Sequence, residues 1–194
     1  PLPATGRAVG LDVGISALLT TSDGDKVPHP AYYRAGQKRL RRLQRKLARA
    51  QRGSHNRRKL LQQVQRQQEH VANQRRDFLH KLSTDLVRTF DRIALEELRV
   101  RNMVRNHHLS KSILDSGWTT FRQLLTYKAE SAGSEIAFVN PAYTSSRCSQ
   151  CGAVFQDFDL STRWVVCACG LSLDRDHNAA LNILRRAGWD TSVP

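Results

Sequence analysis

The four cysteines of the chain form two close pairs, Cys148 with Cys151 and Cys167 with Cys169, and fifteen residues separate the pairs. Two short cysteine pairs separated by the length of a β-hairpin can close a tetrahedral thiolate site for Zn²⁺. The glycine directly after each pair would let the backbone turn under the metal. Four protein ligands leave no open position, so the pattern predicts a structural site. Two disulfides or four unrelated thiols are the alternative, and His177 is a replacement ligand if Cys167 or Cys169 does not bind.

Acidic residues stand at places where a carboxylate needs a partner. Asp12 ends an apolar run, Glu96 follows Ile-Ala-Leu, and Asp174 and Asp176 flank Arg175 before an alanine-rich segment. A carboxylate at the end of a buried strand is unfavourable unless a charge or a metal neutralises it. Carboxylates holding two divalent ions would bring metal and phosphodiester together. A turn residue for Asp12 and a helix N-cap for Asp174 or Asp176 are the alternatives, and the spacing leaves open whether these acids converge.

The positive charge is concentrated in one segment. Between Lys38 and Arg76 there are 14 Lys and Arg and one acid, Glu69, which gives +13 of the total +14. Apolar residues recur there with helical spacing on both sides of the turn-forming residues 53–56, which predicts a helical hairpin over residues 37–90. A nucleic-acid backbone is the predicted partner and a solvated charged surface the alternative. The candidate nucleic-acid-binding residues are Lys38, Arg39, Arg42, Arg45, Lys46, Arg49, Arg52, Arg57 and Arg58.

The segments around the hairpin alternate between strand and helix patterns. Apolar, β-branched runs predict strands over 7–12, 15–20, 26–27, 93–95 and 136–139. Helical spacing predicts helices over 118–131 and 177–187. This order is typical of an α/β domain with a mixed sheet. Two of the acids would then lie on strands and the pair around Arg175 just before the last helix.

Length and composition restrict the class of protein. The 194 residues, 40% of them hydrophobic, predict one domain with at most a small insert and exclude a disordered basic tail. No apolar run is long enough for a transmembrane helix, and the first residues lack the order of a secretory signal. We therefore expect a reduced, cytoplasmic protein with an anionic partner and no membrane association. The first residue is not Met, so we expect a piece of something longer.

Several motifs, in order along nearly the whole chain, resemble the C-terminal part of the TnpB (OrfB) proteins of bacterial insertion sequences, relatives of the type V CRISPR effectors. They are GLDVG at 10–14, IALEEL at 93–98, CSQCG at 148–152, CACG at 167–170 and DRDHNAALNI at 174–183. The resemblance implies an α/β, RNase H-like (RuvC) nuclease domain over 1–145 and 173–190. The basic helical hairpin over 37–90 and a zinc ribbon over 146–172 would be insertions in it.

The resemblance also implies the roles of the acids. Asp12, Glu96 and Asp176 would be the first, second and third catalytic carboxylates and would bind Mg²⁺ or Mn²⁺, with Asp174 as the alternative to Asp176. The predicted function is that of a metal-dependent DNA endonuclease, directed in this bacterial or archaeal family by a guide RNA. We expect the N-terminal recognition part, which grips the guide in relatives, to lie outside these 194 residues. The alternatives are a non-cleaving nucleic-acid-binding fragment or accessory factor of transposition, and a Holliday-junction resolvase.

Overall fold

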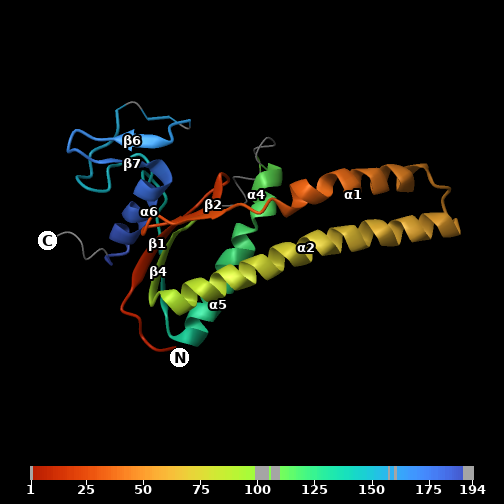
Figure 1. Cartoon of the computed structure of the whole chain (residues 1–194), viewed down its shortest axis with the longest axis horizontal. Coiled ribbons are helices and arrows are strands. Elements are labelled where there is room, and N and C mark those ends of the chain that lie inside the picture. Colours follow the sequence, from red (N-terminus) through yellow and green to blue (C-terminus); the bar gives the residue numbers. More distant parts are fainter. Residues whose placement is uncertain (1, 99–104, 106–109, 157, 160, 190–194) are drawn as a thin grey trace.

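The computed structural model describes residues 2–98, 105, 110–156, 158–159 and 161–189. Figure 1 shows a small sheet covered by helices and a long helical hairpin that extends away from it. Among the described residues, every helix is too short or too polar to cross a membrane. The elements in chain order are β1 (Ala8–Val13), β2 (Ala17–Thr21), β3 (Lys26–Pro28), α1 (Tyr32–Arg49), α2 (His55–Thr89), β4 (Arg92–Glu96), α4 (Ser110–Ser116), α5 (Trp118–Ala132), β5 (Glu135–Val139), β6 (Trp164–Val166), β7 (Ser172–Asp174) and α6 (Arg175–Arg186).

The central sheet is mixed, as the sequence predicts. Its strand order is β3-β2-β1-β4-β5, in which β1, β2 and β3 pair antiparallel and β1, β4 and β5 pair parallel. In the parallel register, Leu11 of β1 lies beside Leu95 of β4. Glu96, the next residue of β4, lies beside Val139 of β5. Asp12 and Glu96 each follow a member of the pair Leu11 and Leu95, so they lie at the same end of the sheet.

The larger part of the hydrophobic core fills one face of the sheet. Val9, Leu11 and Ile93 are fully buried there and pack against α2 and α5, whose Leu79 and Leu125 are also buried. Each fully buried aliphatic side chain of this kind contributes about 1.5–3 kcal/mol. This layer fixes the positions of β1 and β4, the two strands that carry Asp12 and Glu96.

The opposite face of the sheet is covered by α6. Ala94 and Val139 are buried against Ile183 of α6. The helix crosses β1 at Gly10, where a Cβ would overlap the carbonyl oxygen of Ala180. Glycine is therefore required at this crossing, because a larger residue would push backbone against backbone.

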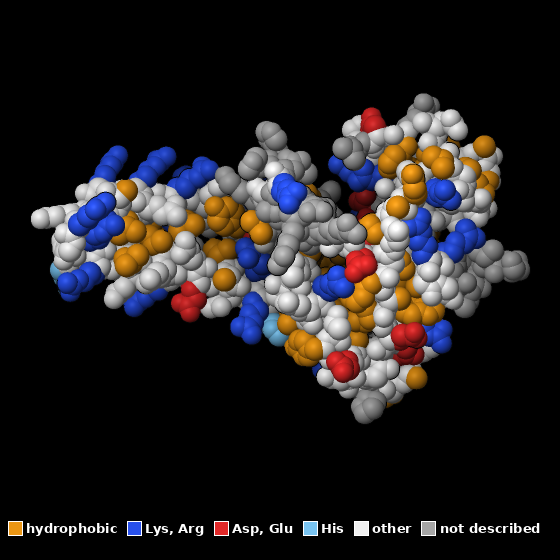
Figure 2. Space-filling view, turned by 180° about the vertical axis from the view of Figure 1, so that it is seen from behind, with side chains coloured by type: hydrophobic (Ala, Val, Ile, Leu, Met, Phe, Trp, Pro, Cys, Tyr) orange, Lys and Arg blue, Asp and Glu red, His pale blue; other side chains and the backbone are white. Residues whose placement is uncertain are grey.

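The basic hairpin is formed by α1 and the first half of α2. Leu40, Val64 and Val71 are buried between the two helices, whereas Leu61, which has the same helical spacing, is 45% exposed. Ser54 caps α2 by accepting a hydrogen bond from the backbone N–H of Arg57. The Lys and Arg side chains project from the outer surface of this hairpin (Figure 2).

The helices differ from the predicted elements in several places, since α1 begins at Tyr32 rather than at residue 37. The sequence pattern did not predict α4, which is only seven residues long and shows less than two turns of apolar spacing. The last helix begins at Arg175, two residues earlier than predicted, because Asp174 acts as its N-cap.

Candidate functional site

Asp12 and Glu96 belong to the face of the sheet that α6 covers. Successive side chains of a strand point to opposite faces, so Asp12 shares a face with Gly10, and Glu96 shares a face with Ala94. Gly10 contacts α6 closely, and Ala94 is buried against Ile183 of α6. The two acids therefore point toward the layer that contains the DRDHNAALNI motif.

Asp176 lies in the first turn of α6, and its neighbours have separate contacts. Asp174 accepts hydrogen bonds from the backbone N–H groups of Asp176 (3.0 Å) and His177 (3.2 Å), and its other oxygen lies 2.8 Å from Nζ of Lys26. Arg175 forms an ion pair with Asp176 at 3.1 Å. Asp174 thus has the structural role that the sequence left open, and Asp176 is the acid of this pair that does not cap the helix.

The surroundings of Asp12 and Glu96 disfavour the ionised form of both carboxyl groups. Burial raises the pKa of Asp12 well above its usual range, and the nearby carboxylates of Glu96 and Asp176 raise it further. Burial also raises the pKa of Glu96, although a hydrogen bond from Thr144 and the charge of Arg186 oppose this shift. Asp12 therefore stands in the field of both other acids, which is the arrangement that a bound cation would relieve.

The four cysteines form a more compact group than the acids. Their four sulfur atoms lie within 4.8 Å of one another, and in the described part of the chain no other group of three or more His, Cys, Asp or Glu is close enough to hold a metal ion. Sγ of Cys148 is 3.6 Å from Sγ of Cys169, and Sγ of Cys151 is 3.5 Å from Sγ of Cys167. These separations are far longer than a disulfide bond, and the four thiols fit a tetrahedral structural Zn²⁺.

The glycines after the cysteine pairs have the predicted turning role. Gly152 has a φ of 78° and Gly170 a φ of 95°, in the left-handed region that favours glycine. The backbone N–H of Gly170 donates to the carbonyl of Cys167 at 3.0 Å, which closes the turn between β6 and β7. His177 is not part of the cluster, because its Nε2 lies 2.9 Å from the carbonyl oxygen of Ser22.

Sequence reasoning missed three buried polar residues beside the acids: Thr144, Asn178 and Asn182. Asn178 and Asn182 bind backbone groups near Cys148 from one side of α6, and the hydroxyl of Thr144 donates to Glu96. The sequence pattern could have indicated the asparagines, since two amide side chains one turn apart interrupt an otherwise alanine-rich helix. No sequence pattern could have indicated Thr144, because its partner Glu96 is 48 residues away in the sequence.

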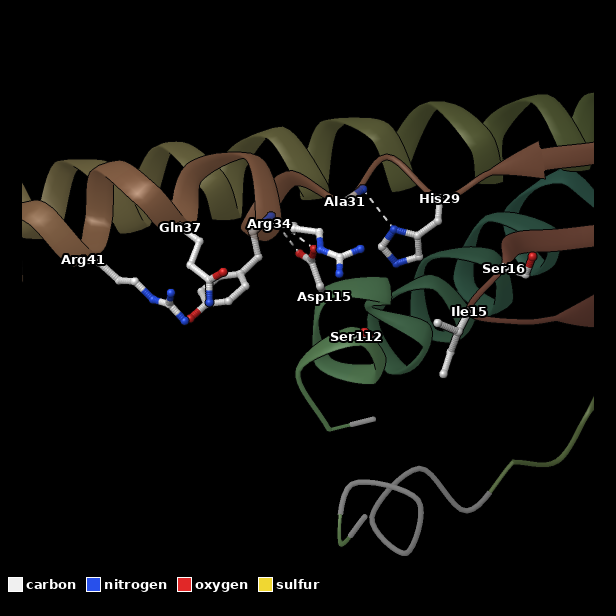
Figure 3. Close-up of a pocket in the computed structure, with 10 residues that line it drawn as sticks. Ile15, Ser16, His29, Ala31, Arg34, Gln37, Arg41, Ser112 and Asp115 are labelled. Carbon is white, nitrogen blue, oxygen red and sulfur yellow. Dashed lines mark hydrogen bonds between the residues drawn. The ribbon is translucent and has the colours of Figure 1, made fainter. Parts of the chain in front are cut away.

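The candidate nucleic-acid-binding residues are all on the hairpin, and all but Arg57 are exposed. Arg57 donates to the carbonyls of Leu47 (2.6 Å) and Ala50 (3.4 Å) and so caps the end of α1. At the base of the hairpin, a cavity of about 500 Å³ is lined by Arg34, Gln37 and Arg41 of α1, among others (Figure 3). Asp115 also lines it, and its carboxylate is paired with Arg75 at 2.7 Å.

Comparison with known proteins identifies the family of this fold. Residues 1–107, more than half of the chain, match the family model OrfB_IS605, described as "Probable transposase". Residues 118–183 match the model of the Cas12f1-like TNB domain. The chain belongs to the TnpB (OrfB) family. Within the family it corresponds to the C-terminal RuvC-like and four-cysteine portion, which is related to Cas12f.

Similar proteins with known names are longer than this TnpB chain. A Streptomyces pristinaespiralis protein named "Putative RNA-guided DNA endonuclease" is 42% identical over 185 residues, which cover 95% of this chain and 46% of that protein. InsQ of Escherichia coli K12, with the same description, is 36% identical over 200 residues, covering 95% and 50%. The chain thus spans about half the length of these relatives.

Solved structures show the same fold. A cryo-EM structure of a CRISPR-Cas12f ternary complex matches with a TM-score of 0.69 and 18% identity, covering 100% of this chain and 40% of that chain. A Cas12f1–sgRNA–target DNA complex matches with a TM-score of 0.66 and 18% identity, covering 94% and 50%. These matches confirm the predicted mixed α/β, RuvC-like fold.

Proposed function

We propose that this chain is the metal-dependent DNA endonuclease portion of a TnpB protein, with Asp12, Glu96 and Asp176 as the catalytic carboxylates. The observation that carries the proposal is geometric. Asp12 and Glu96 lie at the same end of neighbouring parallel strands and point to the face that α6 covers, and Asp176 lies in the first turn of α6. The relatives named as RNA-guided DNA endonucleases support the same reaction and the same nucleic-acid partners, target DNA and guide RNA.

The donor set fits Mg²⁺ or Mn²⁺. Carboxylate oxygens are the ligands that such ions prefer, and Asp12 is buried beside two further acids. The chemistry that such ions would supply here is activation of a water molecule and stabilisation of the leaving oxygen of the phosphodiester. Asp12 and Glu96 would supply oxygens from the sheet, and Asp176 would supply them from the first turn of α6. Asp174 is held by the helix cap and by Lys26, which favours Asp176 as the third ligand.

The other two parts of the chain would support this centre. The exposed Lys and Arg side chains of the hairpin would bind the phosphates of DNA or guide RNA, in agreement with their excess of positive charge. Zn²⁺ on the four cysteines would be structural and would hold the segment next to α6. The hairpin would therefore provide affinity, and the cysteine site would provide rigidity.

Cleavage of labelled single- and double-stranded DNA in the presence of Mg²⁺ or Mn²⁺ tests the proposal. We expect the wild-type chain to cut and Asp12→Ala to lose cutting without losing DNA binding. Asp77→Ala, which removes an exposed acid paired with Lys81 on α2, is the matched control and should cut normally. Binding without cutting by the wild type would favour the alternative function, a non-cleaving nucleic-acid-binding fragment.

The role of the hairpin is tested separately by salt dependence. Replacing Arg39, Arg42, Arg45 and Arg49 together by Gln should flatten the dependence of the binding constant on salt, by about 0.7–0.9 in the log–log slope for each phosphate that is no longer neutralised. The protein should remain folded, because all four side chains are exposed. An unchanged slope would assign these residues to a merely solvated surface.

A further inference from the structure

Residues 140–149, which we call the connecting segment, join the end of β5 to the first cysteine of the cluster. The segment starts next to Val139, which pairs with Glu96, and it contains Cys148. Both of its ends are held by α6. Nη1 of Arg186 donates to the carbonyl of Asn140 at 2.5 Å, and Nη1 of Arg185 donates to the carbonyl of Ser149 at 2.7 Å.

Two buried asparagines of α6 hold the middle of the connecting segment. Asn182 donates both amide hydrogens, one to the carbonyl of Thr144 (2.8 Å) and one to the carbonyl of Arg147 (2.7 Å). Asn178 donates to the same carbonyl of Arg147 at 2.8 Å and accepts from the N–H of Ser149 at 2.9 Å. Asn178 is fully buried and Asn182 is 8% exposed, so these hydrogen bonds are shielded from water.

Thr144 connects this segment to the sheet. Its side chain is buried, and its hydroxyl lies within hydrogen-bond distance of Oε1 of Glu96 and 3.0 Å from the carbonyl of Pro141. A hydroxyl has one hydrogen, and an ionised carboxylate can only accept. The hydrogen bond to the charged oxygen is the stronger of the two, so the hydrogen goes to Glu96.

We propose that Thr144 is a positioning residue for Glu96, and that Asn182 holds Thr144 in place from α6. The proposal rests on the proposed function, in which Glu96 binds a divalent ion. By fixing one carboxylate oxygen, the Thr144 hydroxyl sets the orientation in which the other oxygen meets the ion. The connecting segment also contains Cys148, and it is hydrogen-bonded to α6, the helix that has Asp176 in its first turn. One set of hydrogen bonds therefore aligns the cysteine site, Glu96 and α6.

Groups that orient a metal ligand have a characteristic mutational effect. Their loss weakens metal binding or activity by about tenfold to a hundredfold while the ligands themselves remain. This effect differs from that of a purely structural residue, whose loss lowers the melting temperature without changing the affinity of the folded protein for the ion. Metal affinity therefore separates the two roles.

The test is Mn²⁺ binding by titration calorimetry, with electron paramagnetic resonance of free Mn²⁺ as a second readout. Thr144→Val, which keeps the shape of the side chain and removes the hydroxyl, should bind Mn²⁺ about tenfold to a hundredfold more weakly. Thr144→Ser restores the donor and should bind within about twofold of the wild type. Thr126→Val, which removes a hydroxyl from the exposed surface of α5, is the matched control and should leave Mn²⁺ binding unchanged. Zinc content should be the same in all four proteins.

Wild-type Mn²⁺ affinity in Thr144→Val would overturn the positioning role. Glu96→Gln distinguishes this failure from a failure of the proposed function. If Glu96→Gln lowers Mn²⁺ affinity and Thr144→Val does not, the metal site stands and only the positioning role fails. If neither variant changes the affinity, the assignment of Glu96 as a metal ligand fails as well.

Asn182→Asp tests the second half of the proposal. The new carboxylate keeps the shape of the side chain but cannot donate to the carbonyls of Thr144 and Arg147. We expect faster hydrogen exchange of the amides in residues 140–149 and a weakening of Mn²⁺ binding similar to that of Thr144→Val. Faster exchange with unchanged Mn²⁺ binding would show that Asn182 holds the segment without acting on Glu96.

Discussion

At the beginning of β4, the carboxylate of Asp91 accepts hydrogen bonds from the backbone N–H of Thr5 (2.8 Å), the hydroxyl of Thr5 (2.9 Å) and the N–H of Gly6 (2.6 Å). These contacts, led by the N–H of Thr5, lower the pKa of Asp91. At the other end of the same strand, burial raises the pKa of Glu96, and it also raises that of Asp12 on the neighbouring strand. At one end of the pair of strands β1 and β4 the surroundings favour the ionised form of an acid, Asp91. At the other end they disfavour the ionised forms of Asp12 and Glu96.

The difference between the two ends separates a structural carboxylate from candidate functional ones. Asp91 joins the N-terminal residues to the sheet, so its ionised form stabilises the fold. Asp12 and Glu96 are carboxyl groups in a place where burial disfavours their ionised form. Folding alone gains nothing from such groups, whereas binding of a cation would. Perturbed groups of this kind concentrate at functional sites, often at a cost in stability.

The largest expected effect is on cleavage. Glu96→Gln should lower the rate of DNA cleavage by at least about a hundredfold, because the carboxylates act together. Without divalent ions, its melting temperature should be unchanged or higher. Asp91→Asn should do the opposite, with cleavage within about threefold of the wild type and a lower melting temperature. A stable, folded Asp91→Asn protein that no longer cuts would contradict the comparison.

The second effect concerns the cysteine site. Cys148→Ser, or removal of Zn²⁺ by a chelator, should lower stability by about 3 kcal/mol or more. This loss corresponds to a decrease of roughly 10 °C in the melting temperature of a chain of this size. Hydrogen exchange should accelerate in the first turns of α6 and in residues 140–149, whereas the amides around Asp91 should keep their protection. Uniform acceleration over both ends of the sheet would remove the distinction between them.

A smaller effect is expected where α6 crosses the sheet. Gly10→Ala would place a Cβ against the carbonyl oxygen of Ala180, so the helix must move, at a cost of about 1–3 kcal/mol, and cleavage should fall with it. Gly36→Ala on α1 is the matched control. Its Cβ meets only side-chain atoms, 2.8 Å from Cγ2 of Val71, and alanine favours the helix, so stability should change by at most about 1 kcal/mol. Denaturant unfolding measures both.

The smallest effect is the opposite pH dependence of the two ends. The pKa of Asp91 is lower in the folded state, so its stabilisation is present above about pH 4 and is lost as the pH falls through the folded pKa. The pKa of Asp12 is higher in the folded state, so its ionisation lowers stability as the pH rises above about 4. Unfolding free energies of Asp91→Asn and Asp12→Asn relative to the wild type, measured against pH without divalent ions, should therefore slope in opposite directions. Slopes of the same sign would contradict the assignment.

Much of the fold follows from local patterns. The strands over 8–13 and 92–96 and the helix over 118–132 lie within two residues of their predicted limits, because apolar periodicity is a property of neighbouring residues. The apolar pattern of α2 was less accurate, since Leu61 has the spacing of a buried residue but is 45% exposed. The domain limits at 145 and 173 stay a prediction.

The sequence by itself determined the cysteine pairs and the basic hairpin, since each is a matter of residue type and short spacing. The acids stood out by their positions, and the choice of Asp12, Glu96 and Asp176 came from the resemblance to the family. Only the tertiary structure decided that Asp12 and Glu96 share the face of the sheet that α6 covers, and that Asp174 rather than Asp176 caps that helix. It also decided that Thr144 meets Glu96 and that His177 meets Ser22, 155 residues away. The physical reason is that periodicity records contacts within a few residues, whereas strand register and helix packing bring together residues from opposite ends of the chain.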